Sequence, residues 1–223
     1  MRTENLTLKI HYYIDWFQDT MPERMAELLR NDISDRKSLV MISAYPSDYE
    51  KSGEIFNTII KVKWLDPAGI IFDEYSLIDY RTAKEEAQKL LKNASVIFLL
   101  GGNAVMQSAL LTDYELPAAI KESNASVIIG VSAGSKNMSA YWVRGGKVYG
   151  GLGLDNFARE VHYKPSDTET VPLDNELFAL SRMIEVYVSC YESVIRSENG
   201  KLEFLGEVYL ISDSKLQKLD ETL

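Results

Sequence analysis

The sequence predicts an α/β fold in which a mostly parallel central sheet is flanked by helices and extended by a C-terminal antiparallel hairpin. Short apolar runs alternate with longer amphipathic segments through residues 38–129, which is the pattern of βαβ units. The apolar runs are continuous, as in strands that helices cover on both faces. Asn199-Gly200 lies between two later apolar stretches and is typical of a hairpin turn. No linker or repeat interrupts the chain, so we expect one domain over residues 1–223.

The expected strands are short and mostly apolar. A weakly alternating segment at 6–12 is the expected first strand, and continuous runs such as "SLVMIS" and "SVIFLL" are expected to be buried. The later strands are expected at 38–43, 68–72, 95–100, 126–129, 186–189, 193–197 and 201–211.

The expected helices have apolar residues three or four positions apart. In the segment 52–65, for example, Ile55, Ile59 and Val62 form one such stripe. The other helices are expected at 22–30, 82–91, 104–111, 116–122 and 174–183, and the stretch 133–142 is compatible with a helix.

Composition narrows the class of protein and its partners. With 46% hydrophobic and 26% charged residues, the chain has the make-up of a soluble globular domain. It shows no apolar run long enough for a membrane span and no secretory signal, and Cys190 is its single cysteine. The net charge of -9 argues against a nucleic-acid partner. We expect a cytoplasmic protein that binds a small molecule or peptide; the oligomeric state stays open, with a homodimer as one option.

The segment 130–134, "GVSAG", matches the G-x-S-x-G pattern of a nucleophile elbow. An apolar strand precedes Ser132 and a helix-compatible stretch follows it. A serine held in such a tight turn needs small neighbours two positions away on each side. The helix that follows directs a backbone N–H toward a developing oxyanion. Ser132 is therefore the candidate nucleophile, although a Gly/Ser-rich turn without catalytic function would have the same local pattern.

A serine nucleophile needs a base, and the chain has only two histidines. His11 lies in the expected first strand among tyrosines, where a packing role is favoured. His162 follows a Gly-rich segment, "GGLGLDNF". A Ser–His mechanism therefore points to His162 as the base.

The acid that would orient the histidine is less clearly indicated. No Asp or Glu occurs between Ser132 and Leu154, so downstream acids are the candidates: Asp155, Glu160, Asp167 and Glu192. Glu160 shares a strand face with His162, but adjacent side chains of one strand rarely form an oriented hydrogen bond of this kind. Glu192 lies in a turn at the end of an apolar strand, from which it could point inward.

Gly101-Gly102-Asn103 follows one expected strand just as the elbow follows the next. In a parallel sheet both loops emerge at the carboxyl edge, where ligands bind. The Gly101-Gly102 backbone could approach a substrate closely and supply a second oxyanion N–H beside that of Ala133. No phosphate-binding motif or metal-ligand cluster is present, so we expect no cofactor and no metal.

Taken together, "SVIFLLGGN", "IIGVSAGS" and "VHY" resemble the peptidase E and cyanophycinase group of serine peptidases, over roughly residues 38–211. The resemblance implies a class I glutamine-amidotransferase-like α/β sandwich. It also implies a nucleophile at Ser132, a base at His162, oxyanion N–H groups at Gly102 and Ala133, and substrate contacts at Gly101 and Asn103.

The same resemblance bears on the acid and the substrate. Cyanophycinase-like members use a glutamate in a strand-end turn, and "VSCYESVI" is similar to that segment, which implies Glu192. Peptidase E proper has an aspartate between the serine and the histidine, and here none stands where it is expected. Short peptides, aspartyl dipeptides among them, are the implied substrates. Two alternatives stay open: a carboxylesterase of the α/β-hydrolase type, and a non-catalytic homologue that binds peptides or small molecules.

Overall fold

The computed structural model describes residues 9–165 and 171–223. Its larger sheet has seven strands in the order β11-β10-β1-β5-β4-β2-β3. The five strands from β1 to β3 in that order are parallel, and β10 and β11 extend the edge as an antiparallel hairpin. The bounds are β1 Ile10–Ile14, β2 Ser38–Ile42, β3 Glu74–Ile78, β4 Val96–Leu99, β5 Val127–Val131, β10 Val194–Glu198 and β11 Lys201–Leu205.

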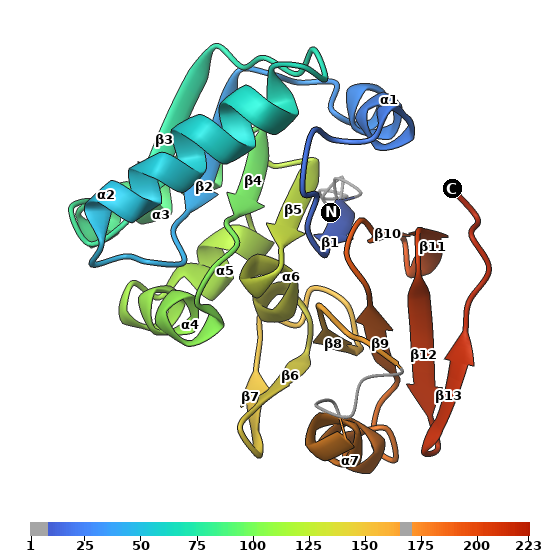
Figure 1. Cartoon of the computed structure of the whole chain (residues 1–223). Helices are drawn as coiled ribbons and strands as arrows, with labels where there is room; N and C mark the ends of the chain where they lie inside the picture. The colour runs from blue at the N-terminus through green and yellow to red at the C-terminus, as the bar shows by residue number, and fades with distance from the viewer. Residues whose placement is uncertain (1–8, 166–170) are drawn as a thin grey trace, which may run out of the picture.

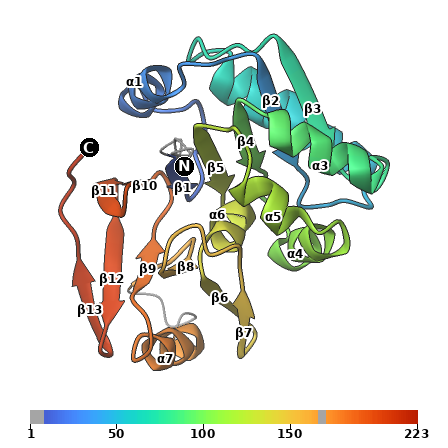
Figure 2. The same ribbon diagram turned by 180° about the vertical axis from the view of Figure 1, so that it is seen from behind.

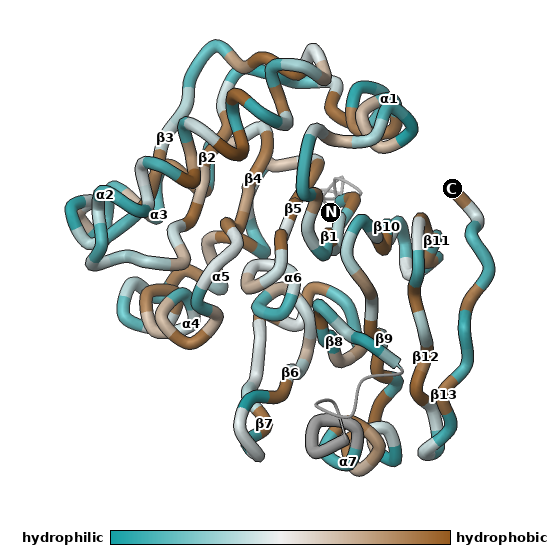
Figure 3. The backbone as a smooth tube through the Cα atoms, viewed as in Figure 1, coloured by the Kyte–Doolittle hydropathy of each residue, from teal (hydrophilic) through white to brown (hydrophobic). Residues whose placement is uncertain are grey.

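Helices cover both faces of this sheet (Figures 1 and 2). Buried residues of α1 and η1 pack with alternate strand residues such as Tyr12 and Met41 in one apolar cluster. Residues of α3, α4 and α5 pack with the intervening strand residues, such as Tyr13 and Val40, in a second cluster. The bounds are α1 Glu23–Asp32, α2 Tyr49–Glu54, η1 Ile55–Leu65, α3 Lys84–Asn93, α4 Ala104–Asp113, α5 Leu116–Lys121, α6 Ala133–Met138 and α7 Val171–Leu180. Strands β4 and β5 are accordingly among the brown, apolar segments of Figure 3.

A second, mixed sheet of six strands lies beside the first, in the order β13-β12-β9-β8-β6-β7. Its strands contribute residues to a third apolar cluster, which includes Val143, Val186 and Ile211. The bounds are β6 Tyr141–Arg144, β7 Lys147–Gly150, β8 Ala158–Glu160, β9 Val186–Ser189, β12 Val208–Ser212 and β13 Lys215–Lys218. Across residues 9–165 and 171–223, no helix combines the length and apolar character needed to cross a bilayer.

The predicted fold class is confirmed, and so is the hairpin turn, where Asn199 and Gly200 have φ values of 55° and 76°. Several elements differ from expectation. The single strand expected at 201–211 is two strands in different sheets, because the chain turns at Gly206 with φ 74°. A Cβ at Gly206 would lie 2.5 Å from the Glu192 carbonyl oxygen.

One further expectation was wrong, and two were confirmed in part. Residues 68–72 are not a strand but an irregular connection that leads to β3. The apolar run reflects the side chains of Ile70 and Phe72, which this connection places in the core. The helix compatible with 133–142 ends at Met138, and the chain continues as β6. The helix expected at 52–65 begins as α2 and continues as a π-helix, in which the Asp66 N–H bonds to the Lys61 carbonyl oxygen at 2.8 Å.

Candidate active site

The segment 130–134 forms a tight strand-to-helix turn between β5 and α6. Ser132 has φ 49° and ψ -104°, a conformation that side-chain-bearing residues seldom adopt. A Cβ at Gly130 would lie 2.6 Å from the Gly134 carbonyl carbon, and one at Gly134 would lie 2.1 Å from the Leu99 carbonyl oxygen. Both glycines are thus required by close backbone approach. The Ser132 N–H donates to the Ile14 carbonyl oxygen at 2.9 Å, which fixes the turn against β1.

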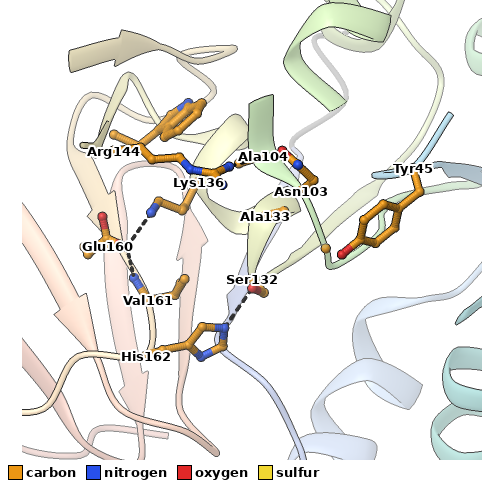
Figure 4. Close-up of a pocket in the computed structure, with 12 residues that line it drawn as sticks. Tyr45, Asn103, Ala104, Ser132, Ala133, Lys136, Arg144, Glu160, Val161 and His162 are labelled. Carbon is orange, nitrogen blue, oxygen red and sulfur yellow. Dashed lines mark hydrogen bonds and ion pairs between the residues drawn. The ribbon is translucent and has the colours of Figure 1, made fainter. Parts of the chain in front are cut away.

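The structure brings Ser132 and His162 together. The Ser132 hydroxyl oxygen lies 2.9 Å from Nε2 of His162, although the two residues come from different sheets (Figure 4). His162 follows β8 with φ 58°, so the chain turns sharply as it places the ring. The exposed Tyr191 ring stacks on the imidazole at a centroid distance of 4.6 Å.

The carboxylate that contacts the other ring nitrogen belongs to Asp15. Its Oδ1 lies 2.5 Å from Nδ1 of His162. Its Oδ2 accepts hydrogen bonds from the His162 backbone N–H and the Ser189 hydroxyl, both at 2.8 Å. The Asp15 residue is fully buried. It directly follows β1, whose Ile14 pairs with Val131 of β5, so Asp15 and Ser132 occupy equivalent positions at the ends of neighbouring strands.

The expectation that Glu192 orients the histidine is therefore corrected. Glu192 lies in the turn between β9 and β10 with φ 60° and is exposed, and its N–H donates to the Trp16 carbonyl oxygen at 2.8 Å. The same turn contacts the site through Tyr191, whose ring stacks on that of His162. Asp15 precedes the serine in the chain, whereas the acids expected from the sequence all follow it.

The other candidate acids have different partners or cannot be placed. Asp155 lies 2.7 Å from Nδ1 of His11, and Glu160 forms an ion pair with Lys136. Asp167 lies outside the residues that the structure describes.

A cavity of about 310 Å³ opens beside Ser132. Gly102 and Ala133, the candidate oxyanion donors, both line it. The N–H of Ala133 is at the first position of α6, where a helix leaves its amides without intrahelical partners. Gly102 has φ 138°, and a Cβ there would lie 2.3 Å from the Tyr45 ring.

Gly101 and Asn103 differ in how they meet the cavity. Gly101 is buried and is not among the lining residues; a Cβ there would lie 3.1 Å from the Trp16 ring. Asn103 lines the cavity, but its side-chain oxygen caps α4 by accepting from the N–H groups of Val105 and Met106. This oxygen also accepts from Arg144 at 3.2 Å. The structure thus gives Gly101 a packing role and places only Asn103 at the cavity.

The cavity wall away from His162 is polar and charged. Lys136 and Glu160 pair there beneath the Trp142 ring, as Figure 4 shows for the two charged side chains. Arg144 also lines the cavity, and within the described part of the chain no carboxylate pairs with it. The wall therefore has an excess of positive charge, although the whole chain carries a net charge of -9.

The fold is shared with proteins described as peptidases. One solved structure, a peptidase from an acI-B1 Actinobacterium, superposes with a TM-score of 0.72 at 16% identity, covering 96% of this chain and 95% of that one. Another, a candidate peptidase E protein from Listeria monocytogenes EGD-e, has a TM-score of 0.62 at 16% identity, covering 89% and 98%. No family model and no curated protein matches the sequence. At this identity the comparison establishes the fold, which agrees with the peptidase E-like architecture that the motifs imply.

Proposed function

We propose that this protein is a serine peptidase that hydrolyses short peptides through Ser132, His162 and Asp15. The observation that carries the proposal is the continuous contact from Ser132 Oγ to His162 Nε2 and from His162 Nδ1 to the buried Asp15 carboxylate. This geometry argues against a non-catalytic homologue, which would have no need to retain it. The names of the two structural relatives support peptide hydrolysis in particular.

In the proposed reaction, Ser132 Oγ attacks the carbonyl carbon of the scissile peptide bond while Nε2 of His162 takes the hydroxyl proton. The N–H groups of Ala133 and Gly102 stabilise the oxyanion that forms. Asp15 holds the imidazolium and compensates its charge. His162 then donates the proton to the departing amine, which leaves an acyl ester on Ser132. A water molecule, deprotonated by His162, hydrolyses this ester and restores the serine.

The cavity suggests which part of the peptide lies where. The departing amine must approach His162 to receive its proton, so the acyl residue extends toward the wall of Lys136, Glu160 and Arg144. A guanidinium without a carboxylate partner favours an acidic group there. We therefore propose that peptides with an acidic residue on the acyl side, such as aspartyl dipeptides, are the preferred substrates.

The test is labelling with a fluorophosphonate combined with hydrolysis of a panel of Asp-X, Glu-X, Ala-X and β-aspartyl dipeptides. Ser132→Ala should abolish both labelling and hydrolysis. Ser108→Ala, which changes a half-buried serine on α4 outside the cavity, is the control and should leave both unchanged. Labelling that survives Ser132→Ala would overturn the nucleophile assignment. Hydrolysis of nitrophenyl esters without hydrolysis of any dipeptide would favour the esterase alternative instead.

A further inference from the structure

A fully buried arginine stands behind the candidate triad. Arg159 of β8 has no exposed surface and makes no direct ion pair with any described carboxylate. Its guanidinium donates to the carbonyl oxygens of Glu160 and Tyr187 at 2.6 and 3.2 Å and to the hydroxyls of Ser135 and Ser189 at 3.1 and 2.5 Å. Burying a cation is costly unless nearby negative charge compensates it, so the arrangement calls for an explanation.

The hydroxyl of Ser189 connects this arginine to Asp15. A guanidinium is only a donor, so Ser189 Oγ must accept from Arg159. Its single proton is then available for Asp15 Oδ2, which lies 2.8 Å away. The direction of every hydrogen bond from Arg159 through Ser189 to Asp15 is thereby fixed.

We propose that Arg159, acting through Ser189, is a positioning residue that turns Oδ1 of Asp15 toward Nδ1 of His162. This inference rests on the proposed function. A carboxylate turned away from Nδ1 could not compensate the charge of an imidazolium. The Ser189 hydroxyl and the His162 N–H occupy Oδ2, which leaves Oδ1 free for the ring.

Among the described residues, Tyr13, Cys190 and Glu160 are further titratable groups near this network. Burial raises the pKa of Tyr13 well above its ordinary value and that of Cys190 to about 11. Glu160 is paired with Lys136. Burial lowers the pKa of Arg159 to about 10, while the charges of Asp15 and Glu160 oppose this shift, so Arg159 stays charged.

The chain contains its own matched control. At its other histidine, the buried Ser197 donates to Asp155 Oδ1 at 2.6 Å, and Asp155 contacts His11. Ser197→Ala therefore removes a buried serine–carboxylate hydrogen bond beside a histidine, as Ser189→Ala does, but outside the cavity that contains Ser132.

The test is an NMR titration of the two imidazole rings in the intact protein, together with the pH dependence of dipeptide hydrolysis. In Ser189→Ala, the weaker contact with the carboxylate should lower the titration midpoint of His162 and leave that of His11 unchanged. Ser197→Ala should do the reverse. Hydrolysis should fall about 10-fold to 100-fold in kcat for Ser189→Ala, with KM nearly unchanged, and its acid limb should move to lower pH. Ser189→Thr, which retains a hydroxyl, should restore most of the rate.

The outcomes separate this inference from the proposed function. An unchanged His162 midpoint in folded Ser189→Ala would overturn the positioning role even if Ser132→Ala is inactive. If Ser189→Ala does not fold, Arg159→Lys is measured instead, because the single ammonium group of lysine cannot make all four hydrogen bonds of the Arg159 guanidinium. A normal His162 midpoint in that variant would overturn the proposal. If the wild-type protein hydrolyses nothing, the ring titrations still decide the inference.

Discussion

Replacing Asp15 by asparagine tests the candidate triad most directly, because the structure dictates how the new amide would sit. Oδ2 of Asp15 accepts from two donors, the His162 N–H and the Ser189 hydroxyl. To accept from both donors, the amide oxygen of Asn would have to take the position of Oδ2. Its NH₂ group would then face Nδ1 of His162. Nδ1 would then have to accept a hydrogen bond, and the ring proton would move to Nε2. A ring protonated at Nε2 cannot take the proton of Ser132.

The expected loss follows from this tautomer change. In a Ser-His-Asp protease the same replacement lowers kcat by about 10⁴-fold, which corresponds to about 5 kcal/mol of transition-state stabilisation. The Asp15 contact of 2.5 Å and its complete burial indicate that the dependence here is of the same order. Asn is nearly isosteric with Asp, so the fold should survive. We therefore expect Asp15→Asn to melt as one cooperative unit while losing about 10³-fold to 10⁴-fold in activity.

The assay is the rate of fluorophosphonate labelling and of dipeptide hydrolysis, measured beside thermal unfolding. Glu192→Gln is the matched control, since this exposed carboxylate is the acid that the motif comparison favours. It should retain activity within about threefold of the wild type. If Glu192→Gln loses more than Asp15→Asn, the assignment of Asp15 as the orienting acid is refuted.

Three further outcomes are expected. The free energy of unfolding of Ser132→Gly should exceed that of Ser132→Ala by about 1 kcal/mol in denaturant titrations, because glycine relieves the strain at φ 49°. Equal free energies of unfolding would contradict a strained turn at Ser132. Arg144→Gln should lower kcat/KM for Asp-X dipeptides by about 10-fold or more and leave Ala-X hydrolysis unchanged, as a competition assay would show. Burial favours a higher pKa for Asp155, but its contacts with His11 and with two hydroxyls outweigh burial and hold this pKa below the ordinary value. Ionised Asp155 therefore stabilises the fold fully above about pH 4, and this stabilisation is lost as the pH falls further. Denaturation at several pH values should show that the difference in free energy of unfolding between wild type and Asp155→Asn becomes smaller in acid.

The residues that could be predicted from the sequence are those whose geometry is set locally. The small neighbours of Ser132 are required by contacts within one strand-to-helix turn, and Asn199-Gly200 sets its own turn. The strand ends that place Gly102 and Ala133 follow from continuous apolar runs. Each of these features depends on a few adjacent residues, so the pattern alone indicates it.

Asp15 could not be assigned in this way because its position depends on distant pairing. β1 lies between β5 and β10, and nothing within residues 10–14 specifies those neighbours. A signal was nevertheless present: in "IHYYID", a polar residue directly follows an apolar strand, as Ser132 follows β5. The second sheet was missed for a related reason, since β8 and β9 are short and are separated in sequence by α7.

The central place of β1 also sets the order in which the candidate triad can assemble during synthesis. Asp15 leaves the ribosome early, but its strand pairs with β5 and, at its other edge, with β10, which ends at Glu198. The Asp15 N–H bonds to the carbonyl oxygen of Ser193 at 3.0 Å. A nascent chain that already contains Ser132 and His162 therefore still lacks the strand that encloses their carboxylate. Such long-range closure slows folding, and it delays assembly of the candidate triad until most of the polypeptide has been made.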